Sequence, residues 1–212
     1  AMSVFVAEEL SEVLNTKVVI GRINMGLLNR IIIDDVLLDD QSGQEMLKVT
    51  RLSAKFDIMP FFKGKISISS VQLFGFNINL RKETPDSPPN FKFVLDAFAS
   101  KDTVKKENSL DLRINSILIR RGRMSYHVLS EEETPGKFNA KHIQLQNIIA
   151  NISLKALSKD SLNLGIKRLS LDEKASGFSL KKMSLKLVAN NKQTNIDNFT
   201  IELPETSLKL DT

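Results

Sequence analysis

The chain has 212 residues, of which 42% are hydrophobic and 26% charged, a composition typical of folded globular proteins rather than disordered chains. It contains no cysteine, which excludes disulfides, cysteine-ligated zinc and a thiol nucleophile. The net charge of +5 is a small excess of 30 basic over 25 acidic residues, so the composition does not point to a nucleic-acid-binding protein. At this length, one large β domain and two small ones are both possible.

The first predicted element is an amphipathic helix within residues 1–16. Val6, Leu10, Val13 and Leu14 recur at helical spacing, and three glutamates lie on the other side. We expect this helix to pack on a sheet or to close its end. A helix lying on a membrane surface is the alternative, although its acidic face would be repelled by anionic lipid.

Residues 17–212 are predicted to be a β region built from a recurring unit. After residue 16 the hydrophobic period changes to two, and an eight-residue unit follows the order apolar, any, apolar, polar, polar, apolar, any, apolar. Such units begin at residues 31, 47, 66, 112, 143, 164 and 178. Their uneven spacing argues against a solenoid of fixed repeat length.

The polar pair in the middle of each unit predicts a bent strand. In a regular strand, successive side chains alternate between faces, so two apolar residues on either side of a polar pair would face opposite ways. A β-bulge or a sharp bend at the pair restores one apolar face. We therefore predict a mainly β fold, in which a long, strongly curved antiparallel sheet forms an open groove or incomplete barrel. An ordinary β-sandwich, which also presents one apolar face per strand, is the alternative.

The apolar positions of four units are the candidates for contact with an apolar ligand. With twelve Phe, one Tyr and no Trp, the large apolar side chains carry few polar groups to orient a polar ligand, so acyl chains or β-strand edges suit this surface. An uncovered apolar patch of this kind usually marks a binding surface. The candidate groove-lining residues are Ile31, Ile33, Val36, Leu38, Ile66, Ile68, Val71, Leu73, Leu112, Ile114, Ile117, Ile119, Phe178, Leu180, Met183 and Leu185.

Residues 84–108 interrupt the strand pattern and contain a possible boundary within the β region. A Pro-rich loop at 84–90 is followed by Phe91, Val94, Leu95 and Phe98 at helical spacing, which predicts a short helix over 91–100. The charged residues 101–108 are then interpreted as a connector. A second interruption, Glu131 to Gly136, is predicted to be an exposed turn.

No arrangement of residues in the sequence predicts catalysis, a cofactor or a metal ion. His127 and His142 have no second histidine or carboxylate at ligand spacing, so neither is expected to bind metal. The pair Asp34-Asp35 occupies the polar slot that other units fill with either sign of charge, which predicts a solvent-facing position, and the pair Asp39-Asp40 is likewise not expected to be a catalytic or calcium site. No glycine-rich phosphate-binding motif or nucleophile motif is present.

The densest basic cluster also fails to predict a nucleic-acid partner. Arg120, Arg121 and Arg123 have a single aromatic neighbour, Tyr126, so the stacking platform of single-strand binding proteins is missing. We expect these arginines to lie on a solvated face.

Six segments of the chain carry a resemblance to a known family. They are Gly21-Arg22-Ile23, Ile31 to Leu38, Pro60-Phe61-Phe62-Lys63-Gly64-Lys65-Ile66, Leu73-Phe74-Gly75-Phe76-Asn77-Ile78, Leu169 to Phe178 and Leu203 to Ser207. With the first four, the stretch from Val18 to Leu80 resembles the N-terminal part of AsmA-like and TamB-like proteins, TamB being the translocation and assembly module. The last two are similar to the TamB branch found in Bacteroides-like bacteria.

This resemblance implies a non-enzymatic section of a longer envelope-biogenesis protein. A helix before residue 1 would anchor the protein in the inner membrane, and the β region would extend through the periplasm as a hollow, groove-shaped structure. The family is associated with outer-membrane protein assembly and with phospholipid transfer between membranes. The implied partners are phospholipid acyl chains or outer-membrane protein strands, the rest of the full-length protein, and an outer-membrane barrel. A ligand-free scaffold whose β edges pair with neighbouring segments is the alternative function.

Overall fold

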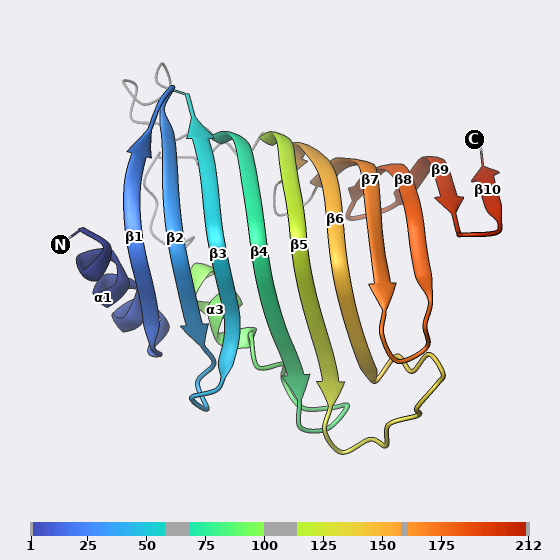
Figure 1. Ribbon diagram of the computed structural model, residues 1–212, viewed down its shortest axis with the longest axis horizontal. Coiled ribbons are helices and arrows are strands. Elements are labelled where there is room, and N and C mark those ends of the chain that lie inside the picture. Colours follow the sequence, from blue (N-terminus) through green and yellow to red (C-terminus); the bar gives the residue numbers. More distant parts are fainter. Residues whose placement is uncertain (1, 58–67, 100–113, 158–160, 211–212) are drawn as a thin grey trace.

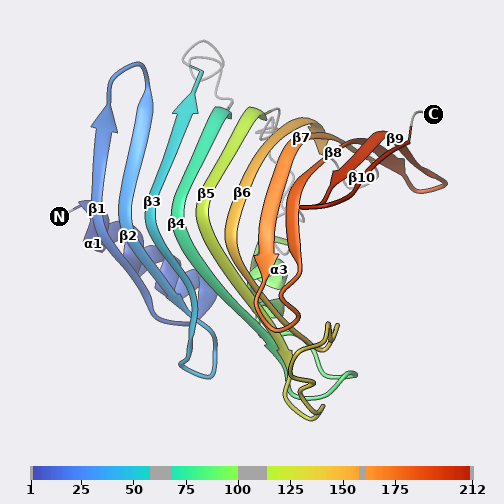
Figure 2. The same ribbon diagram turned by 45° about the vertical axis from the view of Figure 1, so that its right-hand side comes forward.

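The computed structural model describes residues 2–57, 68–99, 114–157 and 161–210, and in them ten strands form one sheet in chain order (Figure 1). The sheet is open, since β1 and β10 lie at its opposite edges, and Figure 2 shows β3 to β6 bowed along their length. The prediction of a mainly β fold with a long, curved, unclosed sheet is therefore confirmed.

The helices and strands have the following bounds: α1 Met2–Leu14, β1 Val18–Gly26, β2 Arg30–Asp39, β3 Glu45–Phe56, β4 Ile68–Lys82, α3 Lys92–Ala99, β5 Ile114–Val128, β6 His142–Leu157, β7 Ser161–Glu173, β8 Ser179–Asn190, β9 Thr194–Glu202 and β10 Ser207–Leu210.

One strand pair differs from the predicted antiparallel arrangement. β4 and β5 pair in parallel, from Ser70 beside Ser116 to Lys82 beside Val128. A parallel pair requires a long crossover, because the chain must return to the other end of the sheet before the next strand begins. Residues 83–113 make this return and include α3. The other strand pairs are antiparallel.

The first five strands change their side-chain register together along one line across the sheet. The pairings on both sides of this line keep a constant register, which places Gly21, Asp35, Thr50, Gly75 and Arg121 next to one another on successive strands. We call these five residues the kink line. Asp35, Gly75 and Arg121 have positive φ angles of 57°, 67° and 54°, a conformation that interrupts the alternation of an L-residue strand.

Bulges lie at five of the seven predicted polar pairs. Between Leu180 and Met183, β8 advances three residues while β7 advances two, from Leu171 to Leu169, so one extra residue lies at Lys181-Lys182. The same comparison places an extra residue at each of four other predicted pairs: Ser69-Ser70, Asn115-Ser116, Gln146-Asn147 and Lys167-Arg168. At Asp34-Asp35 the break is the positive φ of Asp35, without an extra residue.

At Thr50-Arg51 β3 changes face without an extra residue. Its pairing with β2 and β4 is constant there, Leu52 packs against the same cluster as Val49, and Thr50 lies between two residues of positive φ, Asp35 and Gly75. Three further breaks, at Gly75, Arg121 and Asn198, lie outside the predicted polar pairs. At Arg121 and Asn198 an extra residue accompanies the positive φ, as in the predicted bulges.

The predicted N-terminal helix is present as α1, but it uses a different face. Ala7 and Leu14 are buried, whereas Leu10 and Val13 are 37% and 45% exposed. The helix lies beside the edge strand β1, and the Ser11 hydroxyl accepts a hydrogen bond of 3.0 Å from the backbone N–H of Val18. A helix that packs beside a single edge strand buries only a narrow strip of its own surface. Half of the expected apolar face of α1 is therefore exposed. None of the helices in the described ranges has the length and hydropathy needed to cross a membrane.

The second predicted helix is present as α3 and packs at the end of the sheet where β2 stops and β3 begins. Phe93, Val94 and Ala97 pack against a cluster of buried residues, Leu14, Leu38 and Met46. This cluster joins the end of α1, the β2–β3 turn and α3. The two helices therefore hold one end of the first three strands.

Gly75 tests the importance of the kink line. A Cβ at Gly75 would lie 2.7 Å from the Thr50 hydroxyl oxygen, at a φ of +67°. We expect Gly75→Ala to lower the free energy of unfolding by about 2 to 4 kcal/mol, from left-handed strain and overpacking together. Urea denaturation followed by circular dichroism measures this loss. The matched control is Gly43→Ala, at a φ of +82° with open space around it, which should lose about 1 kcal/mol. Equal losses would contradict a close contact at the kink line.

Candidate functional site

One row of apolar side chains crosses all ten strands. Each member is the direct cross-strand partner of the next, and we call this set the central row. Its members are Ile23, Ile33, Leu52, Leu73, Ile119, Ala150, Leu169, Met183, Ile201 and Leu208. Neighbouring strands are about 4.8 Å apart, so the row is about 43 Å long.

Two further rows extend the central row into a surface. The upper row consists of Met25, Ile31, Ala54, Val71, Ile117, Ile152, Ile166 and Leu185. The lower row, beyond the kink line, consists of Ile20, Val36, Val49, Phe76 and Ile148, with Gly122 between the last two. We call the three rows together the apolar face.

The kink line is what places the lower row on the same face as the central row. Val49, Phe76 and Ile148 of the lower row form one buried cluster, and central-row residues from β3, β4, β5 and β7 pack against it. In a strand without a break, Val49 and Leu52 of β3 would point to opposite faces, because they are three residues apart. The change of register therefore adds a third row to the apolar surface.

Most of the apolar face is not covered by a second layer in the described residues. Among the eighteen members of the central and upper rows, only Ala150 is buried, while Met25 and Leu208 are exposed and the others are half-buried. Core residues between two packed sheets would be mostly buried. The sandwich alternative therefore does not describe this sheet.

Nine of the sixteen predicted groove-lining residues lie in the three rows of the apolar face. They are Ile31, Ile33, Val36, Val71, Leu73, Ile117, Ile119, Met183 and Leu185. Four others face apolar or aromatic partners near the strand ends: Leu38 opposite Leu47, Ile68 opposite Phe56, Ile114 opposite Leu154 and Leu180 opposite Leu171. Phe178 precedes β8 and is 46% exposed. Ile66 and Leu112 lie outside the described residues.

The candidate set missed the most buried part of the apolar face. Val49 and Ile148 belong to units that the pattern had identified but that were not carried into the candidate set. Phe76 follows Gly75, which the eight-residue pattern did not contain. A Cβ at Gly122 would lie 2.2 Å from the Phe76 ring, so this glycine makes room for the ring. The sequence signal for this part of the apolar face was a glycine in one predicted strand and an aromatic residue in another strand that could pair with it.

The face of the sheet opposite the apolar face carries an ion pair beside the kink line. This ion pair corrects the prediction that Asp34 faces solvent. Asp34 was expected to face solvent but is 5% exposed, and only Asp35 is exposed. Arg51 Nε lies 2.6 Å from Asp34 Oδ1, and Arg22 lies 3.2 Å from Oδ2. The hydrogen bond from Arg51 is the main cause that lowers the pKa of Asp34. The carboxylate joins three adjacent strands at the point where they bend.

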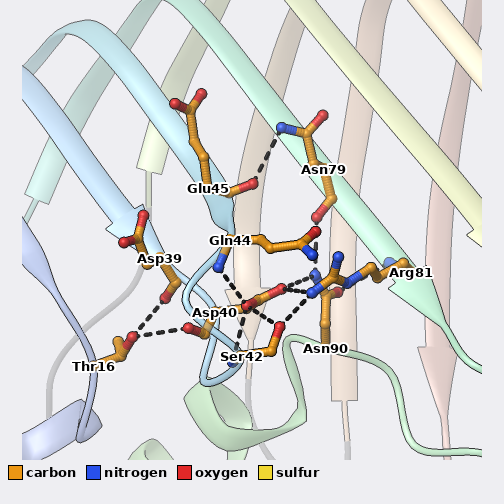
Figure 3. Close-up of polar contacts among 9 residues, drawn as sticks. All are labelled: Thr16, Asp39, Asp40, Ser42, Gln44, Glu45, Asn79, Arg81 and Asn90. Carbon is orange, nitrogen blue, oxygen red and sulfur yellow. Dashed lines mark hydrogen bonds and ion pairs between the residues drawn. The ribbon is translucent and has the colours of Figure 1, made fainter.

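The second acidic pair forms a structural cluster around Asp40, shown in Figure 3. Asp40 Oδ1 accepts hydrogen bonds from the backbone N–H groups of Ser42 and Gln44, both 3.0 Å long, and from the Ser42 hydroxyl. Its Oδ2 accepts from Arg81 at 2.8 Å and from Asn90 at 3.2 Å. With both oxygens used and 2% exposure, this carboxylate fastens the β2–β3 turn to the end of β4 and to the loop before α3.

The electrostatics of Asp40 follow from these contacts. Burial by itself would raise the pKa of Asp40, but the hydrogen bonds from Ser42, Gln44 and Asn90 and the charge of Arg81 together lower it below its ordinary value of 3.8. A carboxyl group with a lowered pKa in the folded state stabilises the fold above pH 3.8, and this stabilisation is lost as the pH falls through the folded-state pKa.

The two histidines meet across β5 and β6, which corrects the expectation that neither has a second histidine nearby. His127 pairs with His142 in register, and their Nδ1 atoms are 2.8 Å apart. Glu133, from the loop between the strands, completes a group whose ligand atoms lie within 4.8 Å of one another. Burial, followed by the charge of His142, lowers the pKa of His127. Linear spacing could not reveal this group because the register of β5 and β6 creates it.

Replacement of Asp40 tests the structural role of this cluster. We expect Asp40→Asn to lower the free energy of unfolding at pH 7 by about 2 to 3 kcal/mol, because Arg81 and two backbone donors lose their charged partner. The difference from the unchanged protein should shrink as the pH falls below 3.8, where the carboxyl group of the unfolded chain takes up a proton, and should vanish once the pH passes through the lowered pKa of the folded state. Chemical denaturation at pH 7 and pH 3 measures both effects. Asp39→Asn is the matched control, since Figure 3 shows its carboxylate pointing away from the cluster, and a loss as large as that of Asp40→Asn would contradict the assignment.

Comparison with models of known protein families finds no match, and comparison with curated proteins finds no similar sequence.

Proposed function

We propose that the apolar face is an open groove that holds the acyl chains of phospholipids, and that the chain acts without catalysis. The observation that carries this proposal is the central row, which crosses ten strands and has no second layer over most of its length among the residues that the structure describes. Continuous apolar surface that no second layer covers is a feature of binding sites rather than of ordinary monomer surfaces.

The dimensions of the central row suit acyl chains. Its length of about 43 Å exceeds the roughly 30 Å thickness of a bilayer hydrocarbon core, which two opposed acyl chains fill. At least two acyl chains can therefore lie end to end along the row. The kink line runs parallel to the central row on β1 to β5, and separate bulges lie on β6 to β9. In this proposal, these breaks shape the sheet into a trough whose floor crosses the strands.

The expected binding strength is modest. Complete burial of a methylene group contributes about 0.8 kcal/mol, and a chain lying in an open trough buries only part of its surface. A wide contact surface of Ile, Leu, Val and Met has no polar group to fix one position. A lipid on this surface can be held and can slide, which suits passage between membranes better than storage.

The cellular setting of this proposal comes from the sequence resemblance. A TamB-like or AsmA-like protein would be anchored in the inner membrane, with this section in the periplasm as part of a conduit towards the outer membrane. Strands of outer-membrane proteins are the other cargo associated with the family. They would bind through their apolar faces or by pairing with a sheet edge.

A scaffold without a ligand is the second candidate function, and the edge strand β10 favours it. All four residues of β10 are exposed, and the central row reaches it at Leu208, which is 50% exposed. The backbone groups along one side of an edge strand are available for pairing with another strand. A further strand pairing with β10 would continue the central row into a neighbouring segment.

A pair of variants on β8 tests the groove. Leu185 belongs to the upper row, whereas Val188 is three residues away on the opposite face and 42% exposed. We expect Leu185→Glu to reduce transfer of a fluorescent phospholipid between vesicles at least about tenfold, because a charge in an acyl-chain path is strongly unfavourable. Val188→Glu, the matched control, should transfer lipid like the unchanged chain.

Circular dichroism and thermal unfolding of both variants separate the two candidate functions. Loss of transfer in a folded Leu185→Glu protein supports the groove. If the unchanged chain neither binds phospholipid nor transfers it between vesicles, the groove proposal is wrong. The scaffold function would then predict that Leu185→Glu in the full-length protein impairs activity only to the extent that it unfolds the sheet.

A further inference from the structure

The histidine pair lies on the face opposite the apolar face, where β5 ends and β6 begins. Met124 and Leu145 pack against the apolar cluster, so His127 and His142, each three residues away along its strand, project from the other side. His142 is 8% exposed, and the two imidazole rings are tilted by 45° with centroids 5.1 Å apart. The loop that joins the strands, at the lower edge in Figure 1, brings Glu133 to the pair.

The hydrogen bonds of His142 determine which of its nitrogens is available. Its Nε2 lies 2.8 Å from the backbone carbonyl oxygen of Glu131, which can only accept, so Nε2 carries the proton and donates. The Nδ1 of a neutral His142 then has a free lone pair, and this atom faces His127. Histidines that bind metal ions commonly donate their other ring nitrogen to a carbonyl in this way, which fixes the orientation of the ring.

We propose that His127 Nδ1, His142 Nδ1 and the Glu133 carboxylate form a binding site for a divalent transition-metal ion of the zinc class. Two imidazole nitrogens and one carboxylate are a ligand set that Zn²⁺ accepts, with water as the fourth ligand. At zinc–nitrogen distances of about 2.0 to 2.1 Å in tetrahedral geometry, the nitrogens would lie about 3.3 Å apart. The present separation of 2.8 Å requires a shift of about half an ångström, and His127 can supply it because it is only partly buried.

The ion would connect the loop to the sheet. Without metal, His127 can donate its Nδ1 proton to His142. With metal, that proton moves to Nε2 of His127, and both Nδ1 lone pairs bind the ion. Glu133 is exposed and lies in the loop of residues 129–141, so its coordination to the ion would hold this loop against β5 and β6. This inference is independent of lipid binding, because the site lies on the other face of the sheet.

Cobalt(II) is the probe that tests the site, since its visible absorption reports its ligands and geometry. The chain has two histidines and no cysteine, so nitrogen coordination by side chains of the untagged protein points to this pair alone. We expect one equivalent of Co²⁺ to bind, with bands that Zn²⁺ displaces, and we expect the metal to raise the midpoint of thermal unfolding.

Two neighbouring glutamates provide the test and its control. Glu133→Gln should weaken Co²⁺ binding at least about tenfold while the chain stays folded, because it removes a ligand from an exposed position. Glu132→Gln should bind within about twofold of the unchanged chain, since that carboxylate is not part of the group. His127→Gln should abolish the bands.

Three results would overturn the proposal: no Co²⁺ binding up to millimolar concentration, binding that His127→Gln leaves intact, or equal affinities for the two glutamate variants. In each of these cases the His127–His142 contact is a hydrogen bond that holds the ends of two strands, without a metal ion.

Discussion

The structure depends on one constraint, the simultaneous change of side-chain register along the kink line. A single strand that changed register alone would turn half of its apolar residues away from those of its neighbours. Five adjacent strands avoid this because residues 21, 35, 50, 75 and 121 lie side by side. Both halves of each strand then contribute to the same apolar face. β6, β7, β8 and β9 reach the same result with separate bulges.

The strand pattern predicted the sheet well because it depends on local chemistry. A polar pair between two apolar alternations can be seen in eight residues, and five of the seven predicted pairs contain an extra residue in the structure. At Thr50-Arg51 β3 changes face without an extra residue, between neighbours that both have a positive φ at the kink line. The pattern omitted Gly75, whose positive φ and contact with Thr50 are properties of two strands together.

The candidate sites were less predictable, because pairing between distant residues creates them. His127 and His142 are fifteen residues apart, and only the register of β5 and β6 makes them neighbours. Asp40 and Asn90 are fifty residues apart and meet because α3 and the loop before it return to the β2–β3 turn. Asp34 looked like a surface residue in the pattern, yet two arginines from the adjacent strands cover it. The residue types and their local spacing give no information about these contacts between residues that are distant in the sequence.

The single parallel pair has a consequence for how the chain folds. It divides the sheet into two meanders, β1 to β4 and β5 to β10, whose strands each pair with a neighbour along the chain. Contacts between residues close in sequence form quickly, while those that close a long loop form slowly. Each meander can therefore assemble by itself, and the β4–β5 seam, which must close over residues 83–113, joins them afterwards. Until it joins, two unpaired strand edges stay exposed to other chains, so this seam is the point at which assembly is most vulnerable to aggregation.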